Sequence, residues 1–201
     1  TWGQSNGPRA DDKQEKTVAI LARLGAEVER NDVGDVEVLS LEKNPGGPFA
    51  GPIKLPRPVM EDLRSLHGLR TLKIRNAQIA GGDARAFSKL QELVDVDVGN
   101  TNISNEGVAE ISKMHWLRRL TLDSLEITDD AMKHVARLKN LEFLDVRGTH
   151  VTMEGLKHLA RLKKLKTRKF NNFTDDQLQH LCELAESPWF LKATDFTNSG
   201  L

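Results

Sequence analysis

Acidic and basic side chains recur through the middle of this 201-residue chain in a pattern that could bring them onto one surface. The aspartates of this region are Asp95, Asp97, Asp123 and Asp145. A cluster of carboxylates can hold calcium, which takes several oxygen ligands, often from a flexible loop. Here Arg119 and other cations stand among the aspartates, and no loop with the alternation of a calcium site surrounds them. We therefore expect no metal at these residues.

Three histidines stand in matching contexts, His134 in KHVARL, His158 in KHLARL and His180 in QHLCEL. A zinc site needs about four ligands that converge at about 2 Å, and only Cys182 is near enough in sequence to join them. We interpret the shared position as the product of repeat duplication. The chain also shows no Ser–His–Asp or Cys–His pattern, no phosphate loop and no HExxH motif. The sequence therefore predicts a protein that is not an enzyme and has no cofactor.

The elements that carry these residues repeat with a spacing of 24 residues. One column of the repeat is Leu69, Leu93, Leu117, Leu141 and Leu165, and a second column, five residues later, is Ile74, Val98, Leu122, Val146 and Phe170. A fixed period in the twenties with this leucine pattern is typical of a leucine-rich repeat solenoid. We predict an α/β fold: a right-handed horseshoe with a parallel sheet on its concave side and helices on its convex side.

The sequence motifs also show a family resemblance. The segments TNISNEGVAEISKM, LEITDDAMKHVARL and THVTMEGLKHLARL share one pattern of Thr, Gly or Ala, and spaced apolar residues, each preceded by an LxxLxV run. With these motifs the chain resembles the bacterial leucine-rich repeat proteins of planctomycete-type genomes. The resemblance covers roughly residues 11–201, and it implies a protein-interaction module.

The repeats do not fill the whole chain. We expect a flexible tail at 1–10, a helix–strand cap with the first strand at 11–43, and a Pro/Gly-rich irregular insertion at 44–58. Leucine-rich repeats then occupy 59–201 and end in a degenerate C-terminal repeat, because Arg168 stands where earlier repeats have Leu or Val. Ser104, Thr128, Thr152 and Thr174 precede the repeat helices and are expected N-caps.

Composition limits the possible partners and compartments. Lys plus Arg and Asp plus Glu are equal at 29 each, so no net charge draws the chain to nucleic acid. No stretch is long and apolar enough to insert into a membrane. The sequence begins at Thr1 rather than Met, which slightly favours a trimmed protein of the cell envelope or a secreted one. We expect a monomer.

The polar rows that would line the concave sheet are the candidate binding surface. The candidate partner-binding residues are Lys73, Arg75, Asp95, Asp97, Arg119, Thr121, Asp123, Phe143, Asp145, Arg147 and Lys169. In this register Lys73 would lie beside Asp97, Asp95 beside Arg119, and Asp123 beside Arg147. We predict that an unidentified protein binds here, and that the double charge reversal Asp97→Lys with Asp145→Lys removes binding while the fold stays intact.

Other interpretations of the same residues stay open. The charged rows are explained more simply by ion pairs between neighbouring strands of a solvated sheet, each contributing about 0–1 kcal/mol. The chain could be a structural scaffold or spacer of a larger assembly, or, less favoured, a small-ligand or metal-binding protein. The basic run RLKKLKTRK at 161–169 is a solvated rim by default, and a patch for phosphate or an acidic protein is the second interpretation.

Overall fold

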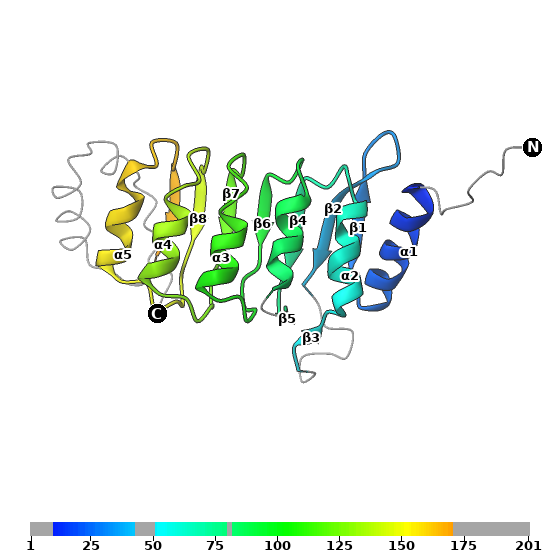
Figure 1. The fold of residues 1–201 in the computed structure, drawn as a ribbon, viewed down its shortest axis with the longest axis horizontal. Helices are drawn as coiled ribbons and strands as arrows, with labels where there is room; N and C mark the ends of the chain where they lie inside the picture. The colour runs from blue at the N-terminus through cyan, green and yellow to red at the C-terminus, as the bar shows by residue number, and fades with distance from the viewer. Residues whose placement is uncertain (1–9, 43–50, 80–81, 171–201) are drawn as a thin grey trace, which may run out of the picture.

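The computed structural model describes residues 10–42, 51–79 and 82–170. They form a seven-stranded main sheet backed by a row of helices, and a separate two-stranded sheet of β3 (Ile53–Lys54) and β5 (Ala77–Gln78) (Figure 1). The α-helices are α1 (Ala10–Arg23), α2 (Arg57–Asp62), α3 (Asn105–Ile111), α4 (Asp129–Val135) and α5 (Met153–Lys157). The 3₁₀ helices are η1 (Leu63–Ser65), η2 (Asp83–Lys89) and η3 (His158–Arg161). The strands are β1 (Glu27–Arg30), β2 (Val36–Leu41), β3 (Ile53–Lys54), β4 (Thr71–Ile74), β5 (Ala77–Gln78), β6 (Asp95–Asp97), β7 (Arg119–Thr121), β8 (Phe143–Asp145) and β9 (Thr167–Lys169).

The main sheet has the strand order β1-β2-β4-β6-β7-β8-β9. Strand β1 is antiparallel to β2, and every later neighbour is parallel. From β4 onward each ladder pairs residues 24 positions apart, so Leu72, Val96, Leu120 and Leu144 form one continuous row. These four side chains are fully buried against the helices. The predicted α/β fold with a parallel sheet is confirmed.

The repeat helices carry apolar residues three positions apart, and these residues are buried against the sheet. Val108, Ile111 and Met114 are fully buried, and the equivalent residues of α4 and α5 are buried in the same way. A spacing of three suits a 3₁₀ helix as well as one face of a short α-helix. Both forms occur with this spacing: α3 and α4 are α-helices, η2 is a 3₁₀ helix, and α5 continues as η3.

Only one of the described N-cap positions is capped by its own side chain. Thr152 Oγ1 accepts a hydrogen bond from the backbone N–H of Glu154 at 3.2 Å. Ser104 and Thr128 occupy the N-cap position without such a bond. Ser104 Oγ instead donates to Glu106 at 2.6 Å, and Thr128 Oγ1 accepts from Asn105 of the preceding repeat. Thr174 lies outside the described residues.

The N-terminal cap begins with α1, which packs on α2 and η1. Helix α1 ends at Arg23, two residues before Gly25, whose φ of 92° is the left-handed conformation expected after a helix. Part of the expected irregular insertion is ordered structure. Ile53 and Leu55 are buried, strand β3 pairs in parallel with β5, and α2 begins at Arg57. Residues 1–9 and 43–50 lie outside the described part.

A column of left-handed residues follows the strands. Asn76 (φ 52°), Asn100 (51°), Ser124 (58°) and Gly148 (68°) stand 24 positions apart. Asn, Ser and Gly therefore share one backbone requirement that side-chain chemistry alone does not suggest.

At the far end, Arg168 takes the place of a core Leu. It is 5% exposed, and its Nη2 donates to the carbonyl of Leu165 at 2.9 Å. Residues 171–201, with His180 and Cys182, lie outside the described part, so the degenerate last repeat stays a prediction. Among the described residues, the helices are all too short or too polar to cross a bilayer.

Candidate functional site

The polar residues of strands β4 to β9 and of the positions just after them form the candidate site, which we call the sheet face. The ladders place Lys73, Asp97, Thr121, Asp145 and Lys169 in one row. A parallel row holds Asp95, Arg119 and Phe143. Alternation along each strand turns these residues away from the buried leucines. The register thus brings the predicted residues of separate repeats onto one surface.

The most connected group on the sheet face is Arg75 with two aspartates. Its Nη1 donates to Asp97 Oδ1 at 2.7 Å and to Asp123 Oδ1 at 2.8 Å. Its Nη2 donates to Asp123 Oδ2 at 2.8 Å. Gly99 lies between them, and a Cβ there would fall 2.2 Å from Asp123 Oδ1 and 2.5 Å from Arg75 Nη1. The glycine therefore leaves the room that the guanidinium occupies.

This arrangement corrects two of the three expected ion pairs. Asp123 binds Arg75 rather than Arg147, because the side chain of Arg75 is long enough to pass Gly99. Lys73 lies 3.7 Å from Glu42 and forms no ion pair with Asp97. The expected pair of Asp95 and Arg119 is present at 3.1 Å.

A second correction concerns Asp145, which was expected on an open polar row and is only 3% exposed. Arg147 holds it with two bonds, Nε to Oδ1 at 3.0 Å and Nη2 to Oδ2 at 2.8 Å. The backbone N–H of Arg147 also donates to Oδ1 at 3.2 Å. Replacement of Asp145 by Lys would leave Arg147 without its partner and bury a new cation. The burial of Asp145 is therefore a reason to expect that this charge reversal destabilises the fold.

Phe143 is the aromatic side chain of the sheet face and is half-buried. The guanidinium carbon of Arg119 lies 4.2 Å from its ring centroid, and Lys169 Nζ lies 5.5 Å from it. Both distances are within the range of a cation–π contact. Arg119 is 52% exposed while it also pairs with Asp95. The ring is therefore held in place by two cations and still reaches the surface.

Burial governs the acid–base behaviour of this surface. It raises the pKa of Asp97 above 3.8, against the opposing effect of the Gly99 N–H and of Arg75. It raises the pKa of Asp95 in the same way, against Arg119 and Lys73. Hydrogen bonding to Asp123 raises the pKa of Arg75, and bonding to Asp145 raises that of Arg147. The two arginines stay charged at any pH at which the chain folds.

The described residues contain no group of three or more His, Cys, Asp or Glu side chains that could hold a metal ion. Between Asp97 and Asp123, where a cation could sit, stands the guanidinium of Arg75. Of the histidine column, His134 is half-buried on α4 and His158 is exposed at the start of η3.

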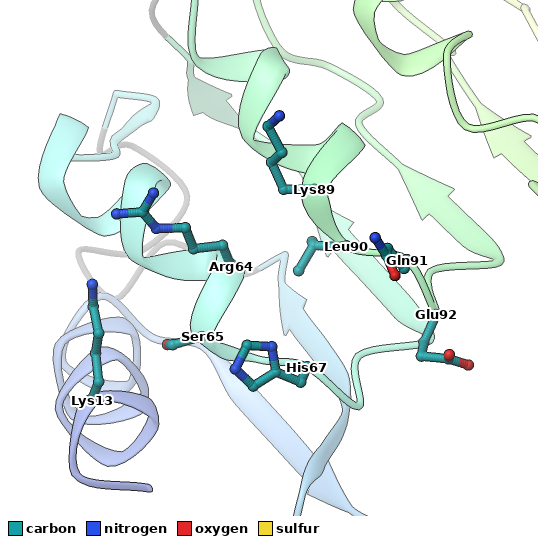
Figure 2. Close-up of a pocket in the computed structure, with 8 residues that line it drawn as sticks. All are labelled: Lys13, Arg64, Ser65, His67, Lys89, Leu90, Gln91 and Glu92. Carbon is teal, nitrogen blue, oxygen red and sulfur yellow. The ribbon is translucent and has the colours of Figure 1, made fainter. Parts of the chain in front are cut away.

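A separate cavity of about 720 Å³ lies on the helix side of the molecule. Figure 2 shows basic side chains around it, Lys13 from α1, Arg64 from η1, His67 before β4 and Lys89 from η2, with Glu92 on the side away from Lys13. Lys13 is paired with Asp62 at 2.8 Å. None of the predicted partner-binding residues lines this cavity. Its parts come from three segments with no shared sequence signal, so sequence analysis missed it.

Comparison with known proteins identifies the type of fold. No protein-family model matches the sequence, and no curated protein matches it. The structure is similar to an internalin (inlF) from Listeria monocytogenes, with a TM-score of 0.51 and 24% identity over 61% of this chain. The match spans only 39% of the internalin chain.

Two further structures are similar. The actin-binding site 2 of leiomodin-1 gives a TM-score of 0.52 at 16% identity, over 63% of this chain and 85% of that one. An internalin C2 (inlC2) from Listeria monocytogenes gives a TM-score of 0.46 at 21% identity, over 82% of this chain and 78% of that one. At these identities the first two likenesses establish the fold, which has leucine-rich repeat character.

Proposed function

We propose that this chain is a non-catalytic protein-interaction module whose partner binds the sheet face across β6, β7 and β8. The observation that carries the proposal is Phe143, an aromatic side chain that reaches the surface between Arg119 and Lys169. Aromatic and arginine side chains dominate the binding energy of protein interfaces. The rest of the sheet face is polar and already paired within the chain, so it can surround such an anchor without strong attraction of its own.

The geometry also favours one kind of contact on the partner. An apolar or aromatic side chain would lie on the exposed edge of Phe143, and a carboxylate would pair with the exposed part of Arg119. Besides its contact with the Phe143 ring, Arg119 pairs with Asp95, and because Arg119 is 52% exposed, water can reach this pair from the arginine side. An actin-binding site of leiomodin-1 has a similar fold. That likeness supports only the general point that a fold of this kind can bind a protein.

The proposal also covers the handedness and curvature of the fold and the type of its repeats. Parallel strands joined through helices wind almost always to the right, which supports a right-handed solenoid. A sheet whose strands are closer together than its helices curves inward, which supports a concave sheet face. The 24-residue spacing of the ladders supports the resemblance to planctomycete-type repeat proteins.

The test compares single truncations of two apolar side chains. Phe143→Ala removes the anchor, and Val33→Ala, at a side chain 81% exposed in the β1–β2 turn, is the matched control. Wild type and both variants would serve as bait in an extract of the source organism, read by mass spectrometry. Circular dichroism would first verify that all three are folded. Direct titration with the recovered protein would then give the dissociation constants.

We expect one protein that wild type and Val33→Ala recover and Phe143→Ala does not. Truncation of an interface anchor typically weakens binding by more than about 2 kcal/mol. The same recovered proteins from all three baits, or none from any, would contradict the proposal and favour a scaffold role.

A further inference from the structure

A groove on the helix side, far from the sheet face, has a charge that the proposed function does not use. It lies between α4 and the α5–η3 segment and has a volume of about 570 Å³. We call it the basic groove, and its lining residues are Lys133, Ala136, Arg137, Lys139, Lys157, His158 and Arg161. Figure 1 places α4 and α5 side by side in the helix row, and the two helices pack together.

Its positive charge is only partly neutralised. Lys133 pairs with Asp130 at 2.5 Å and Lys157 pairs with Glu154 at 2.6 Å. Over residues 10–42, 51–79 and 82–170, no carboxylate lies within ion-pair distance of Arg137, Lys139 or Arg161. None of the residues lining the groove is acidic. Three cations therefore face solvent without a counter-charge from the described chain.

The immediately preceding repeat does not share this excess of positive charge. Lys113, which follows α3, is neutralised by Glu110 of that helix at 2.7 Å. In the next two repeats the same positions hold His134 with Arg137, and His158 with Arg161. The acid is thus replaced by histidine where the groove lies.

The helix dipole explains only part of this charge. Basic residues in the last turn are favourable because the helix C-terminus carries a partial negative charge. Lys139 uses that effect directly, since its Nζ donates to the carbonyl of Ala136 at 2.7 Å. A single cation per helix end would be enough for this purpose, and the effect fades within one turn.

The dimensions of the groove favour a chain of carboxylates over a single anion. Lys133 and Arg137 are four residues apart, about 6 Å along the helix, and packed helices lie about 8–10 Å apart. A single phosphate group can accept hydrogen bonds from only a few donors at once, so it would leave some of the cations that line the groove unpaired. An extended peptide advances about 3.3 Å per residue and can bring successive carboxylates to both sides.

We infer that the basic groove is a second docking site, which takes an extended acidic segment of a partner protein. The site is separate from the sheet face, so it can hold a different part of the same partner or another one. Its contacts are those of Arg137, Lys139 and Arg161 with Asp or Glu side chains. Because these pairs are exposed, binding is sensitive to salt.

The test uses a short fluorescein-labelled oligo-glutamate peptide and fluorescence anisotropy at low salt. The variant is Arg137→Glu with Lys139→Glu, two exposed side chains of one helix end. The control is Lys16→Glu with Lys54→Glu, which makes the same change in net charge at exposed positions of α1 and β3. Melting curves by circular dichroism would establish that both double variants are folded.

We expect the groove variant to bind the peptide at least about tenfold more weakly than wild type, a loss typical of close charge pairs. The control and Phe143→Ala should bind it as wild type does, which separates this site from the proposed sheet-face function. Equal binding by the groove variant and wild type, or no binding by wild type, would overturn the inference. So would tighter binding of a single-stranded DNA of equal charge that the groove variant loses, because it would indicate a phosphate site.

Discussion

Arg75 binds Asp123 across an intervening strand, with Nη2 and Oδ2 2.8 Å apart although the two residues are 48 positions apart in sequence. Arg75 follows β4 and Asp123 follows β7, and Gly99 stands between them after β6. The same guanidinium also holds Asp97. One side chain thus ties three successive strands together, and the charges at this end of the sheet face are paired before any partner arrives.

A methyl group at position 99 should break this tie. In Gly99→Ala the Cβ would overlap the present positions of Arg75 Nη1 and Asp123 Oδ1. Both atoms end flexible side chains, so they can move apart, and the cost is the ion pair rather than the backbone. We expect the free energy of unfolding in urea to fall by about 1 kcal/mol.

Two further variants test whether Gly99 acts through the ion pair of Arg75 and Asp123. Gly82→Ala is the control, since a Cβ there meets nothing within 4 Å, and it should leave stability unchanged or raise it. In an Asp123→Asn background, Gly99→Ala should cost less than it does alone, because the pair it disrupts is already weakened. Equal costs in the two backgrounds would show that Gly99 acts independently of Arg75.

The left-handed column after the strands predicts two substitutions of opposite sign. Ser124, at φ 58°, pays the steric cost of a side chain in this conformation, and Gly148, at φ 68°, does not. Ser124→Gly should raise the free energy of unfolding by about 0.5 kcal/mol, and Gly148→Ala should lower it by about 1 kcal/mol. Chemical unfolding of both variants measures this, and a shift of the same sign in both would refute the conformational explanation.

Asp145 should contribute to stability although it lies on the polar side of the sheet. It is 3% exposed and accepts bonds from the side chain and backbone of Arg147. Asp145→Asn keeps the shape but puts an N–H₂ group where an acceptor is needed. We expect a loss of about 2 kcal/mol in the free energy of unfolding. Thr121→Ala, at a half-buried neighbour in the same row, should cost clearly less.

Asp97 should make stability depend on pH with a defined sign. Burial raises its pKa in the folded chain above the ordinary 3.8. Its contribution to stability is therefore complete below pH 3.8 and is lost as the pH rises through the raised value. Asn cannot ionise, so the stability of Asp97→Asn relative to wild type should increase as the pH rises from 3 to 7. A relative stability that falls over this range would mean that the native pKa is lowered instead.

The sequence was sufficient to predict the register of the strands, but it did not predict which charged side chains pair with one another. Leucines at a fixed spacing place each strand beside its equivalent, so the rows of the sheet face could be written down before the structure. The expected ion pairs assumed that each side chain meets its nearest neighbour in a row. That rule works for Asp95 and Arg119, and it fails where Gly99 leaves a gap that the long side chain of Arg75 can cross.

The sequence also did not show which side chains on the polar side of the sheet are buried. Alternation along β8 gives Asp145 the same outward position as Asp97, yet only Asp145 is almost fully covered, beneath Arg147. Asn76, Asn100, Ser124 and Gly148 stand in register in the sequence, and Asn, Ser and Gly are all common in turns, but the left-handed backbone that they share was not predicted. The basic groove was not visible, because it depends on which arginines and lysines lack a carboxylate nearby.

The sheet face as the binding surface is the central claim, and hydroxyl-radical footprinting of the free chain and of its complex with the recovered partner tests it most directly. Mass spectrometry would follow the oxidation of Phe143 on the sheet face and of Val33, which is 81% exposed in the β1–β2 turn. The account predicts that partner binding lowers the oxidation of Phe143 and leaves that of Val33 unchanged. Unchanged oxidation of Phe143 in a complex formed at saturation would contradict it.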